Sequence, residues 1–436
     1  MSAPPWRNWA GNQHMTPQTV AEPAGTEEIC AQVRAAVGQG QRVKAIGSGH
    51  SFTGIGLTDG RLLTLGRHDR LLQVDGHRVT VQSGLTLRRF NALLAEHGLG
   101  LTNMGDIDVQ TVAGAISTGT HGTGRASGSL AAQVVGLELV LADGRVVSCS
   151  PDVEPALFAM ARLGLGALGI VSAVTFAAEP AFLLTADERP LPLDDVLTGF
   201  EDLVATNEHF EFYWFPHTDV ALTKRNNRSD GPAAPLSRLR AWWDDEFLSN
   251  TVFEATCRLG RLVPSAIPVV NRVAARALSA RTYTDAAPRV FTSPRSVRFC
   301  EMEYAIPRAA LPDVLRELHT LPARHDLRVS FPVEVRVAPA DDIPLSTASG
   351  RDSAYLAVHL FRGTELRPYF DAVEALLTAA EGRPHWGKLH QQDAGYLRAR
   401  YPRFDDFVAT RDRLDPGGVF SNDYLDRVLG RAPAAG

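Results

Sequence analysis

The chain has 436 residues, of which 44% are hydrophobic and 21% are charged, a balance typical of globular proteins that bury a large core. At about 150 residues per domain, this length predicts two to four domains or lobes. The formal net charge of -5 argues against a generally basic nucleic-acid-binding protein.

The cysteines and the terminal segments exclude further classes. The four cysteines are far apart and form no C-x-x-C pair: Cys30, Cys149, Cys257 and Cys300. Neither a cysteine zinc site nor a disulfide framework is therefore indicated. Residues 1–11 lack the apolar segment of a secretory signal, and the longest uncharged apolar stretch, 163–178, is shorter than the roughly 20 residues of a membrane-spanning helix. We expect a cytoplasmic protein without a transmembrane segment, and association with a membrane surface stays open.

The first part of the chain, up to about residue 180, alternates apolar runs with glycines. Apolar residues at helical spacing predict helices over 27–37 and 87–97, each stopped by a glycine. Strands are predicted over five runs: 42–46, 78–82, 134–141, 145–149 and 169–176. The Asp143-Gly144 turn predicts that the third and fourth of these runs form a hairpin.

A glycine-rich loop, Gly47-Ser48-Gly49-His50-Ser51-Phe52, follows the strand predicted over 42–46. Glycine allows backbone N–H groups to approach an anion closely. The Rossmann fingerprint, however, needs a third glycine where Phe52 stands, and the chain contains no Walker A pattern. By itself the motif is more typical of a simple turn than of a phosphate site.

A second glycine-rich segment runs from 103 to 124. Its glycines and hydroxyl residues suit neither a helix nor the core of a strand, but they suit a backbone that wraps a polar cofactor. The candidate cofactor contacts in it are Gly105, Asp106, Thr111, Gly114, Ser117, Thr118, Gly119, His121 and Gly122. Together with the first loop, this segment predicts a dinucleotide site of neither the Walker nor the Rossmann type.

From residue 181 the chain carries more charge and fewer glycines. Strands are predicted over 211–215, 296–304 and 355–361, and helices over 312–318 and 368–380. The Arg- and Ala-rich stretch 236–280 is predicted to be a helical insertion, whose basic face is more typical of a solvated surface than of a nucleic-acid site.

Four separated motifs occur in one order: 47–51, 114–124, 383–388 and 420–422. In this combination the chain resembles the FAD-binding proteins of the vanillyl-alcohol-oxidase type, and within them the sugar branch of aldonolactone oxidases, aldonolactone dehydrogenases and alditol oxidases. The similarity covers nearly the whole chain, beginning at Asn8-Trp9-Ala10-Gly11.

The resemblance implies an α+β fold with two lobes. A PCMH-type FAD-binding lobe is expected over residues 12–180, and a substrate or cap lobe with an antiparallel sheet over 181–382. The segment 383–436 is expected to return to the FAD lobe and the active site, which lies between the lobes.

The resemblance also implies FAD as the cofactor, bound covalently through His50 to the flavin 8α-methyl group. A neutral imidazole nitrogen is a suitable nucleophile for that bond. The alternative for His50 is a loop histidine that only hydrogen-bonds to backbone. His121 is expected to brace the pyrophosphate loop, and Ile170 and Asn422 join the expected cofactor contacts.

Four residues are expected to act on the substrate. Glu334 and Arg336 stand two positions apart, so on a strand they point to one face. By resemblance Glu334 contacts substrate hydroxyls, and Arg336 lies near the reacting end of the flavin, where a permanent charge suits anion stabilisation. Lys388 matches a lysine near flavin and substrate, and His359 matches a pocket histidine. The alternatives are a surface ion pair for Glu334 and Arg336, and a core histidine for His359.

Metal binding is not expected, because His385 and His390 have no carboxylate at helical spacing to complete a ligand set.

Alditol oxidases carry Ser where this chain has Asp106 and Thr where it has Phe361, and an apolar ring disfavours a flexible polyol. The predicted reaction is therefore FAD-dependent oxidation of an aldono-1,4-lactone, of the L-gulono- or D-arabinono- type, at C2. A hydride would pass to flavin N5, and the product would be of the ascorbate type.

The electron acceptor and two other functions stay open. In this family a glycine at the position of Gly105 goes with oxidases, so O2, giving H2O2, is the expected acceptor, with a quinone or cytochrome as the alternative. An alditol or sugar oxidase of the same fold is the second hypothesis. A non-catalytic flavin- or carbohydrate-binding protein is the third, and the presence of His50, Glu334, Arg336 and Lys388 argues against it.

Overall fold

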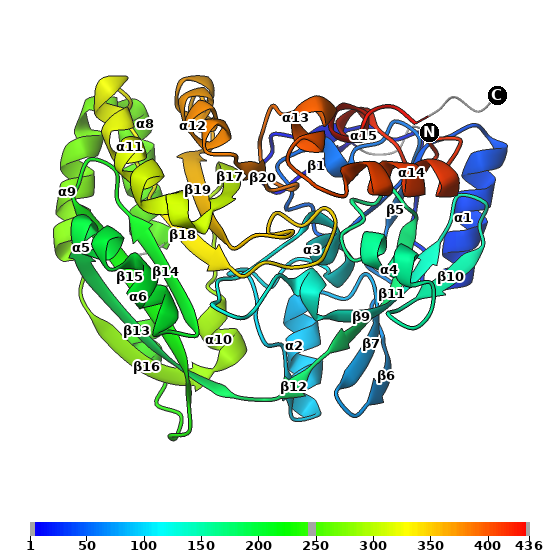
Figure 1. The fold of residues 1–436 in the computed structure, drawn as a ribbon, viewed down its shortest axis with the longest axis horizontal. Coiled ribbons are helices and arrows are strands. Elements are labelled where there is room, and N and C mark those ends of the chain that lie inside the picture. Colours follow the sequence, from blue (N-terminus) through cyan, green and yellow to red (C-terminus); the bar gives the residue numbers. More distant parts are fainter. Residues whose placement is uncertain (1–4, 243–249, 433–436) are drawn as a thin grey trace.

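Two sets of strands divide the fold into two lobes, which lie side by side in Figure 1. The computed structural model describes residues 5–242 and 250–432. One lobe holds a three-stranded parallel sheet and a five-stranded antiparallel sheet, and the other holds an eight-stranded antiparallel sheet. The expected α+β fold, with an antiparallel sheet in the second lobe, is confirmed.

The parallel sheet carries the first glycine-rich loop. Its strands, in spatial order, are β3 (Thr19–Ala21), β5 (Arg61–Thr64) and β4 (Val43–Ile46). Helix α1 (Thr26–Gly38) connects β3 to β4, which lie on either side of β5 and run parallel to it. The buried residues of α1 include Ile29, Val33 and Ala36, at the spacing that turns one face of a helix inward.

The five-stranded sheet has the order β10-β9-β11-β7-β6. Its strands are β6 (Leu71–Asp75), β7 (Arg78–Gln82), β9 (Val134–Val140), β10 (Val146–Cys149) and β11 (Ile170–Ala177). The helices of this lobe are α2 (Leu87–Glu96), α3 (Val112–Thr118) and α4 (Pro155–Ala161), with the short 3-10 turns η1 (Gly54–Gly56) and η2 (Leu130–Gln133). Two small pairs, β1 (Trp6–Arg7) with β2 (His14–Met15) and β8 (Leu99–Gly100) with β12 (Glu179–Pro180), complete it.

The eight-stranded sheet has the order β16-β13-β15-β14-β18-β19-β17-β20. Its strands are β13 (Leu183–Pro192), β14 (His209–Trp214), β15 (Val220–Ser229), β16 (Arg281–Ala286), β17 (Phe299–Pro307), β18 (Val333–Ala338), β19 (Ser353–Phe361) and β20 (Arg383–Pro384). The helices that share its core are α5 (Leu193–Thr198), α6 (Phe200–Ala205), α11 (Leu311–Arg324) and α12 (Arg367–Ala379).

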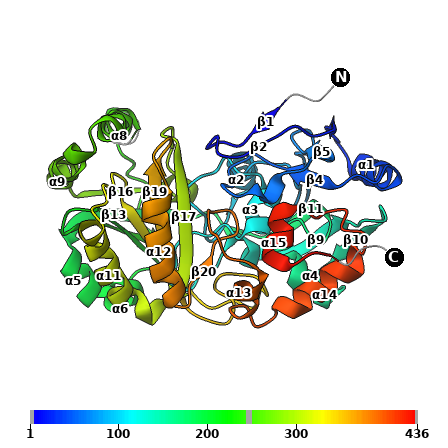
Figure 2. The ribbon, with the colours of Figure 1, turned by 90° about the horizontal axis from the view of Figure 1, so that it is seen from above.

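The two faces of this sheet differ in chemistry because side chains alternate along a strand. In β18, Val333, Val335 and Val337 belong to the hydrophobic core beneath the four helices, which lie along one side of the sheet in Figure 2. Between them Glu334 and Arg336 point to the opposite face. The same alternation in β14 and β17 turns further acidic residues to that face, so one side of the sheet is apolar and the other carries charge.

A helical insertion and the C-terminal segment complete the fold. The insertion contains α7 (Arg238–Ala241), α8 (Phe253–Leu262), η4 (Pro264–Ala266) and α9 (Ile267–Ala277), and it is followed by α10 (Ala287–Phe291). Helices are thus found in the stretch predicted over 236–280, of which residues 243–249 lie outside the described residues. The C-terminal helices are α13 (Ala394–Arg398), α14 (Phe404–Leu414) and α15 (Asp423–Leu429), which Figure 1 shows over the lobe of the parallel sheet.

One local expectation is wrong. Residues 112–118 form helix α3, although their glycine and hydroxyl content predicted irregular backbone. The Thr111 side chain accepts a hydrogen bond from the Gly114 N–H and so caps the helix, and Gly119 ends it with a φ of 80°. Buried Val112, Ala115 and Ile116 hold the helix against the core. In the part of the chain that the structure describes, no helix has the length and apolar character needed to cross a membrane.

Candidate active site

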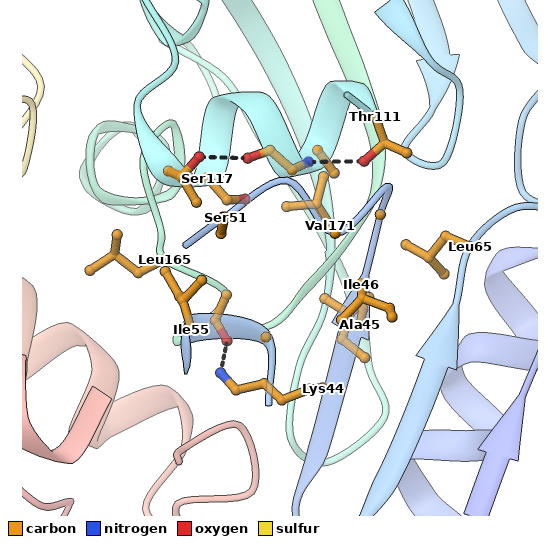
Figure 3. A pocket seen from close by; sticks show the side chains of 18 of the residues that line it. Lys44, Ala45, Ile46, Ser51, Ile55, Leu65, Thr111, Ser117, Leu165 and Val171 are labelled. Atoms are coloured by element: carbon orange, nitrogen blue, oxygen red, sulfur yellow. Dashed lines mark hydrogen bonds between the residues drawn. The ribbon is translucent and has the colours of Figure 1, made fainter. Parts of the chain in front are cut away.

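Two adjoining cavities lie along the glycine-rich loop. The first, with a volume of about 140 Å³, is enclosed by β4 and its loop, helix α3 and residues 165–171 (Figure 3). The second, of about 350 Å³, reaches from the loop to the charged face of the eight-stranded sheet. Both are lined by His50, Ser51, Gln110 and Thr118, so these residues stand where the two cavities meet.

The glycine-rich loop comes very close to helix α3. A Cβ atom at Gly47 would lie 2.1 Å from the Thr111 hydroxyl oxygen, a distance that no side chain tolerates. Only glycine therefore allows the loop and the start of the helix to form the two walls of a narrow cavity. A narrow cavity with backbone N–H groups along one wall fits an extended dinucleotide such as FAD.

Most of the predicted cofactor contacts line these cavities. Those around the first cavity are Gly47, Ser48, Gly49, His50, Ser51, Thr111, Gly114, Ser117, Thr118 and Ile170. Three others, Gly105, Asp106 and His121, line the second cavity. The predicted contacts Gly119 and Gly122 line neither cavity.

Asn422 also lies outside both linings, and it acts on the loop instead. Its amide nitrogen donates hydrogen bonds to the carbonyl oxygens of Gly54, Ile55 and Leu57, at 2.9–3.1 Å. Its side-chain oxygen accepts from the Leu425 N–H and caps α15. Asn422 thus joins the C-terminal helix to the turn that follows the glycine-rich loop.

His50 is held as a neutral imidazole between the cavities. Its ring stacks on Trp9, with centroids 5.3 Å apart. Burial, and then the positive charge of Lys388, lower the pKa of His50 to about 4. At neutral pH the ring therefore keeps an unprotonated nitrogen, the form that a nucleophile requires.

Glu334 and Arg336 lie in the second cavity, within a buried charge network. Arg336 pairs with Glu334, and its Nε donates to Glu211 Oε2 at 2.9 Å. The Tyr213 hydroxyl donates to Glu334 Oε1 at 2.9 Å, across a register that places Tyr213 opposite Glu334. Burial raises the pKa of Glu334, although Arg336 opposes that rise. Glu334 is thus the carboxylate of this network that most readily accepts a proton.

Asp106 closes this network from the other lobe. It pairs with Arg295 and lies 3.7 Å from Arg336 Nη2. Burial alone would raise the pKa of Asp106, but Arg295 and Arg336 outweigh burial and hold it below its usual range. The two lobes therefore meet at the site through opposite charges.

Lys388, in the turn after β20, and His359, on β19, both approach Glu301 of β17. Lys388 pairs with Glu301, and His359 Nε2 lies 3.5 Å from the same carboxylate. Burial opposes the charge of Lys388, but Glu301 and Glu303 raise its pKa, so the ammonium stays protonated. The second cavity thus holds a cation from each of two networks, Arg336 and Lys388.

His121, which was expected to brace the pyrophosphate loop, lines the second cavity and not the first. Its ring stacks on Tyr355 at 3.7 Å, and its Nε2 lies 3.1 Å from Glu303 Oε1. Together with His385, these groups bring three metal-binding atoms within 4.8 Å of one another. The nitrogen Nδ1 of His385 accepts from the Gly387 N–H at 3.1 Å, so a neutral His385 carries its proton on Nε2.

Several residues of the site escaped sequence reasoning: Glu211, Tyr213, Lys224, Arg295, Glu301 and Glu303. The signal was present in the alternation of His209-Phe-Glu-Phe-Tyr and Cys300-Glu-Met-Glu, where acidic residues interrupt apolar strands at every second position. Phe361, which was expected to shape the substrate pocket, lies outside the cavity lining and packs in a buried cluster with Phe299 and Phe331.

Two family models match the chain, one over each of the two lobes. A family model described as D-arabinono-1,4-lactone oxidase matches residues 174–428, and one described as FAD binding domain matches residues 17–150. The first covers the whole eight-stranded sheet and nearly all of the C-terminal helices, and the second covers the glycine-rich loop and helix α3.

Two relatives match almost the entire chain. The L-gulono-1,4-lactone dehydrogenase of Mycobacterium tuberculosis (strain ATCC 25618 / H37Rv) is 43% identical, over 98% of this chain and 100% of that protein. The L-gulonolactone oxidase of Bos taurus is 33% identical, over 97% of this chain and 98% of that protein. Among solved structures, cholesterol oxidase from B. sterolicum has the same fold, with a TM-score of 0.81 at 18% identity over 98% of this chain and 97% of that one.

Proposed function

The chain belongs to the D-arabinono-1,4-lactone oxidase family of FAD-dependent oxidoreductases, and from this premise we propose that it oxidises an aldono-1,4-lactone at C2. The substrate would be of the L-gulono- or D-arabinono- type. The observation that carries the proposal is the placement of Glu334, Arg336 and Lys388 around one cavity that adjoins the FAD-binding loop at His50.

Each of these residues has a role that follows from its charge and surroundings. FAD, when bound, would supply the two-electron acceptor for a hydride from the substrate. Glu334, whose pKa is raised by burial, accepts the proton of the C2 hydroxyl. Arg336 provides a fixed positive charge where negative charge develops, and Lys388 donates hydrogen bonds to substrate oxygens. His359 positions the Glu301 carboxylate that holds Lys388.

His50 is proposed to bind the flavin covalently through its 8α-methyl group. Two observations support this proposal: the imidazole of His50 is neutral, and it lies where the two cavities meet. A covalent bond there would retain the cofactor and fix the ring system next to Lys388 and Glu334.

The substrate proposal is tested by flavin reduction in the absence of oxygen. The flavin absorbance should bleach when L-gulono-1,4-lactone or D-arabinono-1,4-lactone is added, and it should stay unchanged with the open-chain polyols of the same carbon number. Bleaching by the polyols and not by the lactones would replace the lactone proposal with an alditol oxidase. Bleaching by neither would contradict both.

The acceptor is proposed to be O2, on the strength of Gly105. A Cβ atom at this position would lie 3.2 Å from Thr120 Cγ2 and 3.3 Å from the His121 carbonyl oxygen, so a methyl group fits only tightly and fills the space beside it. Gly105→Ala should therefore slow reoxidation of the reduced flavin by O2, while the rate of reduction by lactone changes little. Stopped-flow measurement of both half-reactions checks this. If O2 reoxidises the unchanged protein and the Gly105→Ala variant at the same rate, the result would favour a quinone or cytochrome as the natural acceptor.

A further inference from the structure

The chain contains only three lysines, Lys44, Lys224 and Lys388, among its 44 basic residues. Lys44 is buried and the other two are partly buried, and two of the three line the cavities: Lys388 the second and Lys44 the first. Lys388 and Lys224 each pair with a glutamate, Glu301 and Glu211. The role of Lys44 is therefore still to be assigned.

Lys44 is buried, and none of the described carboxylates forms an ion pair with its amine. It lies on β4 and is 3% exposed. Within the described residues its Nζ has one hydrogen-bond partner, the Gly166 carbonyl oxygen at 3.4 Å, and no carboxylate within 4.0 Å. Burying an amine with so little compensation is costly, and burial lowers its pKa to about 7, although Asp415 opposes this. Because its other N–H donors have no partner among the described residues, we infer that a ligand in the cavity accepts from them.

The position of Lys44 in the cavity indicates which part of FAD would lie beside it. Figure 3 shows Lys44 at the opposite end of the cavity from Ser51 and helix α3. His50, which marks the flavin end, lines both cavities, whereas Lys44 lines only the first. A dinucleotide that places its flavin at His50 therefore places its other base at Lys44.

The chemistry around Lys44 matches that base. Apolar side chains line this cavity and offer contacts for a flat ring: Leu65, Leu165, Ile170 and Phe420. The Lys44 amine and the Gly166 carbonyl form an adjacent donor and acceptor. Adenine presents the complementary pair at its edge, a ring nitrogen that accepts and an amino group that donates.

We propose that Lys44, together with the Gly166 carbonyl, binds the edge of the adenine ring of FAD and lets the protein distinguish FAD from FMN. Lys44 donates to a ring nitrogen, and Gly166 accepts from the amino group. The proposal assigns a residue to one end of the cofactor and is independent of the substrate.

Flavin affinity provides the first test. His50→Ala serves as the background, so that flavin exchanges freely, and binding is followed by quenching of flavin fluorescence. Lys44→Met should weaken FAD binding about tenfold or more, as expected for loss of a buried hydrogen bond to a charged group, and leave FMN binding unchanged. Arg42→Met is the matched control, because it removes a positive charge two residues away that does not line the cavity. An equal loss for FAD and FMN, or no loss for FAD, would overturn the proposal.

A second test needs no substitution at Lys44. With only three lysines, amine labelling followed by mass spectrometry reports each site separately. In the flavin-free His50→Ala protein, adenosine should protect Lys44 from labelling, while FMN and inorganic pyrophosphate should not. Protection by pyrophosphate alone would assign Lys44 to the phosphates and contradict the adenine contact. Neither readout involves lactone oxidation, so its outcome is separate from that of the proposed reaction.

Discussion

His50 occupies the point where the two cavities meet, and its neutral ring makes it a ready nucleophile. We expect His50→Ala to abolish covalent attachment of the flavin. The measurement is acid precipitation, followed by the visible spectrum of pellet and supernatant. The unmodified protein should keep its yellow colour in the pellet, and the variant should release it. A yellow pellet from the variant would assign the bond to another residue.

Glu334 gives the reaction a defined pH dependence. Its pKa is raised above the ordinary value of 4.5 by burial, so the fraction that can accept a proton falls as the pH drops through a value above 4.5. The rate of flavin reduction by lactone should fall over the same range. Glu334→Gln should lower that rate about 100-fold or more and remove this acid limb, as expected for loss of a general base. Stopped-flow reduction between pH 4 and 8 checks both, and an acid limb retained by the variant would assign the base elsewhere.

At the scale of elements, the site depends on how closely β4 approaches α3. Gly47→Ala would force a methyl group against Thr111, and such overpacking costs about 1–3 kcal/mol. We expect a lower melting temperature and a lower flavin content. Adding Thr111→Ala removes the hydroxyl and methyl groups that collide, and should restore most of the flavin content. Thr111→Ala alone is the control for the lost helix cap, which is worth about 1 kcal/mol. A double variant as poor as the sum of both changes would rule out the collision.

Sequence patterns predicted the elements whose apolar residues have one clear period. The hairpin of β9 and β10 and the helices α1, α2, α11 and α12 were found in this way, with ends within a few residues except at α11. The long strands β13 and β15 were missed, because they carry charged residues such as Glu188 and Lys224 that face the sheet's polar side. A strand with one polar face and interspersed charges lacks the apolar run on which the prediction relied.

The same limit applied to the site itself. The residues inside glycine-rich motifs, and the pair Glu334 and Arg336, were predicted because local spacing or resemblance marked them. Glu211 was missed because it comes from another strand, and Asp106 was predicted only as a cofactor contact, so its approach to Arg336 from the other lobe was not foreseen. Contacts between distant segments depend on the pairing of strands and the docking of lobes, and neither is written in local sequence. The cytoplasmic location stays a prediction.

At the scale of the whole molecule, we propose that residues 12–180 and 383–436 form one FAD-binding unit and residues 181–382 the substrate unit. Trp386 supports this division, because it lies in the same hydrophobic core as α2 and α3 and stacks on Tyr401. Its indole N–H donates to the Leu345 carbonyl at 2.7 Å, so it also holds the loop between β18 and β19.

Trp386→Ala should therefore destabilise the whole protein by about 3–5 kcal/mol, as is usual when a buried aromatic side chain is removed. Thermal unfolding followed by circular dichroism measures the effect, with the exposed Leu262→Ala as a control that should change little. A loss below 1 kcal/mol for Trp386→Ala would mean that the C-terminal segment contributes little to the core.

The walls of the first cavity come from stretches that lie far apart in the chain: 43–57, 110–118, 165–171 and Phe420. A ligand that touches all of them binds the folded chain and not the unfolded one, so at 1,000 times its dissociation constant it adds about 4 kcal/mol to folding stability. Because FAD is made from the vitamin riboflavin, the supply of riboflavin is expected to affect how fast this protein is degraded. In riboflavin-starved cells, newly made chains are expected to spend longer in open forms that proteases remove, so the amount of this protein should follow the availability of the vitamin even at a constant rate of synthesis.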